Sequence, residues 1–177
     1  MVLSSPLDFI ESQRVRDVCE HWRSLLTGTV PPHRARLDPV EMAAALPFVW
    51  IVEKEAGPSG RYMLRLAGEE VNRLFGESLR HRFIDEIFPP PIASEVVRKL
   101  DTVSETPALV WTLGPFFEGS PDGPVGECAV LPLVGDDNRP ALLGVTVPTV
   151  AMNMPPRRLI PIAQEKRILT LAELTAG

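Results

Sequence analysis

The chain has 177 residues, of which 45% are hydrophobic and 23% charged, and this composition predicts a folded domain rather than a largely disordered chain. Its 18 basic and 23 acidic side chains give a formal net charge of −5, so we do not expect the broad basic surface that nucleic-acid binding requires. No apolar run approaches the roughly 20 residues that span a bilayer, and the chain turns polar soon after its start, so we expect a cytoplasmic protein without a membrane partner.

The first predicted element is a helix over residues 5–27 with one apolar stripe. Ser5 and Pro6 suit its cap and first turn, and Gly28 suits its end. Apolar residues recur at spacings of three and four, and such a stripe is buried either against the domain's own sheet or against a second copy of the helix. We predict a homodimer through this stripe. Its interface residues would be Val15, Val18, Trp22, Leu25 and Leu26.

Further along the chain, strand patterns alternate with helical ones. A short helix over 40–46 precedes a buried strand at 48–53, and turn residues then lead to an alternating strand at 61–68. A short helix over 69–75 and a longer helix from Ile92 to Val103 separate this hairpin from three more strands. These strands are expected at 108–117, 125–134 and 141–147. The order predicts an α+β domain with one antiparallel sheet, and residues 151–177 remain open between an added helix and an added strand.

Two charged residues within predicted strands are candidates for a site. Arg65 and Glu127 would each need a partner if their faces are buried, so a structural Arg65–Glu127 ion pair is the preferred interpretation. The alternative is that Arg65 holds an anionic ligand. Cys19, Cys128 and the three histidines lack metal-ligand spacing, so no metal site is expected.

A set of ordered motifs carries a family resemblance. Trp22, Leu25 and Gly28 are followed by the runs PHRARLDP at 32–39, LPFVW at 46–50, RLAG at 65–68, FGE at 75–77 and ECAVLPL at 127–133. In this order they resemble a bacterial family of small single-domain PAS-like proteins. The chain departs from that family at 79–82, where Leu-Arg-His-Arg replaces a common Gly-Arg, so we expect a different turn there.

The resemblance implies a PAS-like five-stranded antiparallel sheet with a helical insert and an N-terminal helix. We divide the chain into an N-terminal helix (1–29), a PAS-like domain (30–150) and a C-terminal extension (151–177). PAS cavities lie between the sheet and the insert helices. The candidate ligand-binding residues are therefore Arg65, Phe83, Val97, Trp111, Glu127 and Leu131.

The resemblance also bears on cofactors and function. Haem-binding PAS domains typically carry a histidine on the long helix, and this helix has none; photoactive flavin domains need an Asn-Cys-Arg stretch, which is missing here. Both cofactors are disfavoured, and any other is unknown. We expect a non-enzymatic sensory or regulatory module in signal transduction that binds a small ligand or a protein partner. The alternatives are a small cavity enzyme of isomerase or dehydratase type with Glu127 as its base, and a ligand-free interaction adaptor.

Overall fold

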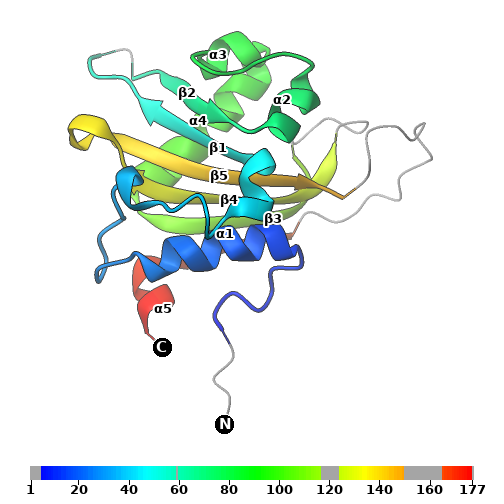
Figure 1. Cartoon of the computed structure of the whole chain (residues 1–177). Helices are drawn as coiled ribbons and strands as arrows, with labels where there is room; N and C mark the ends of the chain where they lie inside the picture. The colour runs from blue at the N-terminus through cyan, green and yellow to red at the C-terminus, as the bar shows by residue number, and fades with distance from the viewer. Residues whose placement is uncertain (1–4, 59, 117–123, 150–164, 177) are drawn as a thin grey trace.

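A six-stranded antiparallel sheet forms the centre of the computed structural model, which describes residues 5–58, 60–116, 124–149 and 165–176 (Figure 1). The strand order is β2-β1-β5-β4-β3-β6. The strands are β1 (Val49–Lys54), β2 (Tyr62–Ala67), β3 (Ala108–Pro115), β4 (Val125–Val134), β5 (Pro140–Pro148) and β6 (Glu165–Thr170). All neighbours pair antiparallel. The α+β prediction is confirmed, and the first five strands follow the predicted chain order.

The sixth strand comes from the segment that the sequence left undecided. β6 pairs with β3 at one edge of the sheet and runs directly into α5 (Leu171–Thr175). Thr170 caps this short helix, because its hydroxyl accepts from Glu173 N and the Glu173 carboxylate accepts from Thr170 N. The extension therefore contributes a strand followed by a helix.

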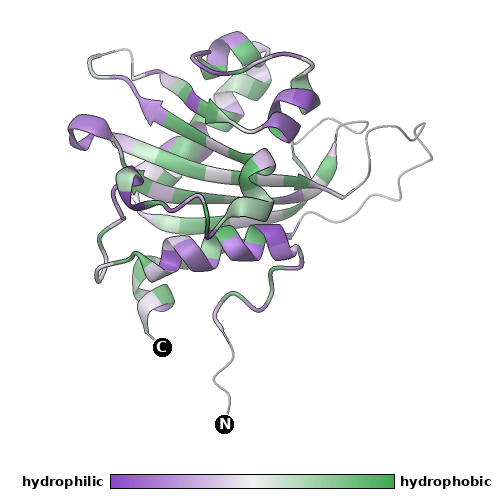
Figure 2. Cartoon of the chain, in the orientation of Figure 1, coloured by the Kyte–Doolittle hydropathy of each residue, from purple (hydrophilic) through white to green (hydrophobic). Residues whose placement is uncertain are grey.

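Helices cover the sheet on both faces (Figure 1). The helices α2 (Glu69–Phe75), α3 (Ile84–Ile87) and α4 (Pro90–Glu105) pack on one face, and α1 (Gln13–Ser24) with α5 packs on the other. Successive strand residues point to opposite faces, so β1, β3, β4 and β5 supply both cores, while β2 supplies the core under α2, α3 and α4 and β6 the core under α1. In Figure 2, hydrophobic residues follow the strands between the two layers, while hydrophilic residues mark the outer side of α1. Three short 3-10 helices, η1 (Arg34–Arg36), η2 (Ala43–Phe48) and η3 (Asp136–Asn138), lie in the connections.

The first helix is shorter than predicted, because it starts at Gln13 instead of residue 5. Ser12 caps it, and its hydroxyl accepts from Val15 N at 3.5 Å. Residues 6–9 form turns instead, which bury Leu7 and Ile10 in the core. The helix predicted over 40–46 is likewise replaced by η2, which contains Pro47. A local cap signal at Ser5 was thus outweighed by burial of apolar side chains.

The apolar stripe of α1 is covered by the domain's own sheet. Val15, Val18 and Trp22 are 0% exposed, and the Trp22 indole donates to the Pro132 carbonyl of β4 at 2.9 Å. Leu25 and Leu26 are half-buried at the end of the helix. The predicted dimer interface is therefore corrected. The sequence left open whether the sheet or a second copy of the helix buries this stripe, and in the structure the sheet buries it. Among the described residues, no helix has the length and hydrophobicity of a membrane span.

Candidate functional site

A cavity of about 250 Å³ lies between the sheet and the helices α2, α3 and α4. Most of its wall is apolar. The sheet contributes Val52, Leu64, Val110 and Val130, and the helices contribute Val71, Ile84, Val96 and Leu100. The prolines at 89–91 set the start of α4, and its stripe then faces the sheet. The wall is apolar because alternate strand residues face the helices and the apolar residues of α4 recur every three or four positions.

A short row of polar groups interrupts the apolar wall. The Trp50 indole Nε1 donates to Thr146 Oγ1 at 2.9 Å, and Thr146 Oγ1 lies 3.4 Å from Cys128 Sγ. Cys128 pairs with Thr146 across β4 and β5 and with Thr112 across β3 and β4, so all three share one face of the sheet. We call Trp50, Thr146 and Cys128 the polar row; with Thr112 they line the cavity.

Gly144 makes the position of Trp50 possible. It pairs with Trp50 across β1 and β5, and a Cβ there would lie 1.9 to 2.4 Å from carbons of the Trp50 indole. Such distances are far below van der Waals contact, so the flat indole occupies the space that a side chain would fill. The missing side chain therefore lets the indole lie across β5 and reach Thr146.

Two ionisable side chains of the cavity wall, Cys128 and Lys99, are kept neutral or charge-compensated. Burial raises the pKa of the Cys128 thiol, which keeps the thiol protonated and poorly nucleophilic at neutral pH. The Lys99 ammonium lies 2.6 Å from the Glu95 carboxylate one helical turn earlier on α4, so its charge is compensated. The wall can therefore bind an apolar molecule and offer it hydrogen bonds.

A family model described as a PAS domain matches residues 10–147. The chain belongs to the PAS domain family. No curated protein matches it. The match covers α1, the first five strands and the insert helices, and it ends before β6 and α5. The two last elements are therefore additions to the part of this PAS domain that the family model describes.

Three of the predicted site residues lie on the other face of the PAS sheet. Trp111 and Leu131 are 1% and 0% exposed in the core beneath α1, and Glu127 is 3% exposed beside them. The Glu127 carboxylate accepts from Trp111 Nε1 at 2.5 Å and from the backbone N–H groups of Glu11 and Ser12 at 2.9 and 2.5 Å. These residues therefore belong to the α1 core and do not line the cavity.

The expected Arg65–Glu127 pair is corrected as well. Arg65 Nε lies 2.8 Å from the Glu53 carboxylate of β1, and Glu53 is 2% exposed. Arg34 approaches the other oxygen of Glu53 at 3.4 Å. The reason is topological: β2 lies next to β1, while β1 and β5 separate it from β4. Arg65 therefore closes a structural ion pair, as the sequence favoured, with a different carboxylate.

Phe83 and Val97 lie in the helical layer that covers the cavity. Val97 packs against the core of that layer, and Phe83 immediately precedes α3. Their neighbours Ile84 and Val96 reach the cavity instead. A choice between adjacent positions on a helix depends on how the helix is rotated about its axis, which the sequence does not give.

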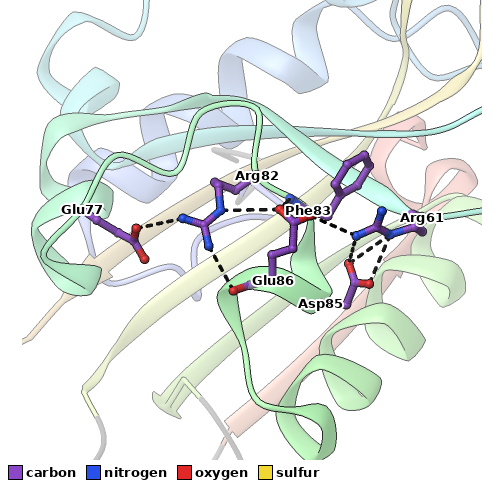
Figure 3. Close-up of polar contacts among 6 residues, drawn as sticks. All are labelled: Arg61, Glu77, Arg82, Phe83, Asp85 and Glu86. Atoms are coloured by element: carbon purple, nitrogen blue, oxygen red, sulfur yellow. Dashed lines mark hydrogen bonds and ion pairs between the residues drawn. The ribbon is translucent and has the colours of Figure 1, made fainter.

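Ion pairs hold α3 and the segment before it against β2 (Figure 3). The Arg61 guanidinium donates to Asp85 at 2.8 Å and lies 3.7 Å from the centre of the Phe83 ring. Arg82 contacts Glu77 at 2.9 Å and Glu86 at 3.5 Å. We call these five charged residues, Arg61, Glu77, Arg82, Asp85 and Glu86, the α3 clasp. The clasp fixes the helix that carries Ile84 and Ile87 over the cavity.

Sequence reasoning did not select Trp50, Thr112, Thr146 or Lys99 as ligand-binding candidates, although all four line the cavity. One signal was available, because a glycine inside a strand often marks a close approach of another group, and Gly144 lies within β5. Strand alternation also required Cys128 and Glu127 to face opposite ways, but not which of them faces the cavity. Among the described residues, no cluster of three or more His, Cys, Asp or Glu could hold a metal ion.

Proposed function

We propose that this PAS domain is a non-enzymatic sensory or regulatory module whose cavity binds a small, mostly apolar ligand. The observation that carries this proposal is the cavity of about 250 Å³ between the sheet and the insert helices. A dry apolar cavity of ~150 Å³ binds benzene, and pockets for drug-sized ligands have volumes of roughly 300 Å³ or more. The cavity therefore fits a molecule built on one ring with small substituents, or a short chain of similar volume.

The chemistry of the wall favours binding over catalysis. Glu127, the base of the alternative enzyme hypothesis, faces the α1 core and accepts hydrogen bonds from three donors there. The lining residues among the described part of the chain include no aspartate, glutamate or histidine, the Lys99 ammonium is paired with Glu95, and burial raises the pKa of the Cys128 thiol. General acid–base catalysis needs a titratable group within hydrogen-bond reach of the substrate. The wall instead supplies contact area and a few hydrogen bonds.

We propose that strand β4 carries the signal of ligand binding from the cavity to the start of α1. Cys128 contributes to the cavity wall, and its neighbour Glu127 binds the backbone just before α1 on the other face. A ligand that shifts β4 would change the geometry at Glu127 and so loosen or tighten the start of α1. Coupling between two sites requires such an element with contacts to both. We propose the start of α1 as the region that a protein partner reads.

The cavity is tested with ethylbenzene as a probe and a variant that fills the space. We expect wild type to bind the probe in a titration followed by NMR, and Val130→Phe to weaken binding at least tenfold. Val40→Phe is the matched control, because Val40 is 79% exposed and lies outside the cavity wall. Equal affinity of wild type and Val130→Phe, or no binding by wild type, would reject the cavity as the ligand site.

The output is tested by amide hydrogen exchange. Binding in the cavity should change the exchange rates of the Glu11 and Ser12 amides, because both donate to Glu127. Unchanged rates at saturation would reject the proposed route through β4.

Native mass spectrometry of the protein from its own host would then identify the natural ligand or partner. The sheet buries the α1 stripe that was the predicted dimer interface, so homodimer formation itself stays a separate proposal, and light scattering that gives a strict monomer at high micromolar concentration would reject it.

A further inference from the structure

The polar row has more hydrogen-bond donors than it uses. Trp50 Nε1, the Thr146 hydroxyl and the Cys128 thiol each carry one hydrogen, and the row contains two contacts. If Thr146 donates to Cys128, the thiol hydrogen is left over. If Cys128 donates to Thr146, the hydroxyl hydrogen is left over. One donor therefore remains in either arrangement, whereas a lone pair of the Thr146 oxygen stays free in only the first.

The surplus donor makes a specific demand on a ligand. A buried donor without an acceptor costs about 1–3 kcal/mol, so a ligand that places an oxygen acceptor against the polar row is favoured over one that places carbon there. Thr112, opposite Cys128 on β3, adds a second hydroxyl to the same part of the wall. The rest of the wall is apolar and suits a hydrocarbon body.

The charge of the wall decides between a neutral and an anionic acceptor. Among the described residues, Lys99 is the charged residue that lines the cavity. Its ammonium already pairs with the Glu95 carboxylate, with 2.6 Å between Lys99 Nζ and Glu95 Oε1. A ligand carboxylate would bring an additional, uncompensated negative charge into a largely apolar space, which is costly. A carbonyl oxygen accepts the same hydrogen bond without that cost.

We propose that the cavity selects an uncharged carbonyl compound of about one-ring size, whose oxygen accepts a hydrogen bond from the polar row formed by Trp50, Thr146 and Cys128. This inference rests on the proposed function, because it names the class of ligand that the cavity binds. It assigns orientation to the polar row and affinity to the apolar wall. The carbonyl end lies against β4 and β5, and the hydrocarbon end lies under α3 and α4.

The test compares acetophenone, ethylbenzene and benzoate as probes of similar shape. The double variant Thr146→Val/Cys128→Ala removes the hydroxyl and the thiol, and the new valine methyl group also covers the Trp50 N–H. We expect this variant to bind acetophenone about 3- to 10-fold more weakly than wild type, as the loss of one neutral hydrogen bond predicts. Ethylbenzene affinity should change less than twofold. Benzoate should bind wild type at least tenfold more weakly than acetophenone.

A matched variant and a spectroscopic signal separate this role from a structural one. Thr146→Val/Cys128→Ser differs from the first double variant by one hydroxyl group and should restore most of the acetophenone affinity. The infrared carbonyl band of bound acetophenone should lie at lower frequency in wild type than in the Ala variant. Circular dichroism and thermal unfolding check that each variant is folded.

Each outcome has a distinct meaning. If ethylbenzene binds in the cavity but the Ala variant treats both neutral probes as wild type does, the carbonyl inference is wrong and the proposed function stands. Tighter binding of benzoate than of acetophenone would also overturn the inference, in favour of an anionic ligand. If neither neutral probe binds wild type, the proposed ligand cavity fails together with this inference.

Discussion

His81 adopts a backbone conformation that most side chains avoid. Its φ is +65°, and its backbone N–H donates to the Leu64 carbonyl of β2 at 2.7 Å. The sequence predicted an altered turn here, because the family often has Gly-Arg in this region. In the structure, His81 has the left-handed conformation that glycine adopts most easily. The turn brings Arg82 beside Leu64, whose N–H donates to the Arg82 carbonyl at 2.9 Å.

Substitutions at His81 should separate backbone from side-chain effects. We expect His81→Gly to leave the free energy of unfolding unchanged or to raise it by up to about 1 kcal/mol, since relief of strain competes with the greater flexibility of the unfolded chain. His81→Val should lower it by about 1–2 kcal/mol, because a β-branched residue is poorly tolerated at positive φ. Urea denaturation measures both values. Equal effects of Gly and Val would show that this conformation is not the cause.

Gly144 is a second residue whose surroundings restrict its side chain, because it lies against the Trp50 ring of the cavity wall. We expect Gly144→Ala to lower the free energy of unfolding by about 1–3 kcal/mol, the usual cost of overpacking, because the added methyl group meets the Trp50 ring. The indole N–H resonance of Trp50 should shift as its hydrogen bond to Thr146 is lost. In a double-mutant cycle, Trp50→Leu should remove most of the extra cost of the alanine. Strictly additive effects would contradict the proposed contact.

At the scale of elements, the α3 clasp links β2 to the helix over the cavity. A hydrogen bond from Arg61 holds the pKa of the Asp85 carboxyl below its ordinary value of 3.8. A depressed pKa stabilises the folded state at pH values above the unfolded pKa, and this stabilisation is lost as pH falls through the folded pKa. The clasp residues are largely exposed, so salt screens their contribution.

An NMR titration of the Asp85 carboxyl tests the clasp. We expect Arg61→Gln to raise its pKa toward 3.8, because the charged donor is lost. Arg80→Gln is the control, since Arg80 is an exposed arginine close in the chain that takes no part in the clasp. Because the folded and unfolded pKa values of Asp85 then nearly coincide, Arg61→Gln should lose less stability than wild type as pH falls below 4. An Asp85 pKa that is the same in wild type and Arg61→Gln would contradict the contact.

The elements were predictable to different degrees. The short helix α2 (Glu69–Phe75) was predicted with its exact end at Gly76, because glycine in the left-handed conformation, here at φ +70°, is a local stop signal. The start of α1 was predicted eight residues too early, because Ser5 and Ser12 are both acceptable caps. What separates them is tertiary: Glu127, more than 100 residues later, binds the backbone at Glu11 and Ser12.

At the scale of the whole molecule, β6 and α5 complete the sheet and the α1 core. Leu171 and Leu174 are 3% and 1% exposed, and the Leu174 carbonyl accepts from Arg23 Nε of α1 at 2.8 Å. The added strand pairs with β3, so it covers an edge that would otherwise be open to association with other chains. The C-terminal elements are therefore part of the packed structure.

Truncation of one leucine tests this docking. We expect Leu174→Ala to lower the free energy of unfolding by about 2–4 kcal/mol through the loss of buried apolar surface and the cavity left behind. Ile168→Ala on β6 should cost less than about 1 kcal/mol, because Ile168 is 50% exposed. Chemical denaturation of the two variants provides the comparison. A similarly small loss for both would mean that α5 is not held against α1 in solution.

By itself, the sequence determined the α+β class, the order of the first five strands and the family, because periodicity, turn residues and short motifs are local properties of the chain. It also indicated that the charge of Arg65, which is partly buried, needs a carboxylate. The tertiary structure decided which carboxylate, which partner covers the α1 stripe, and which face of β4 lines the cavity. These choices depend on strand order and on how two helical layers share one sheet, and both are set by packing between segments far apart in the chain.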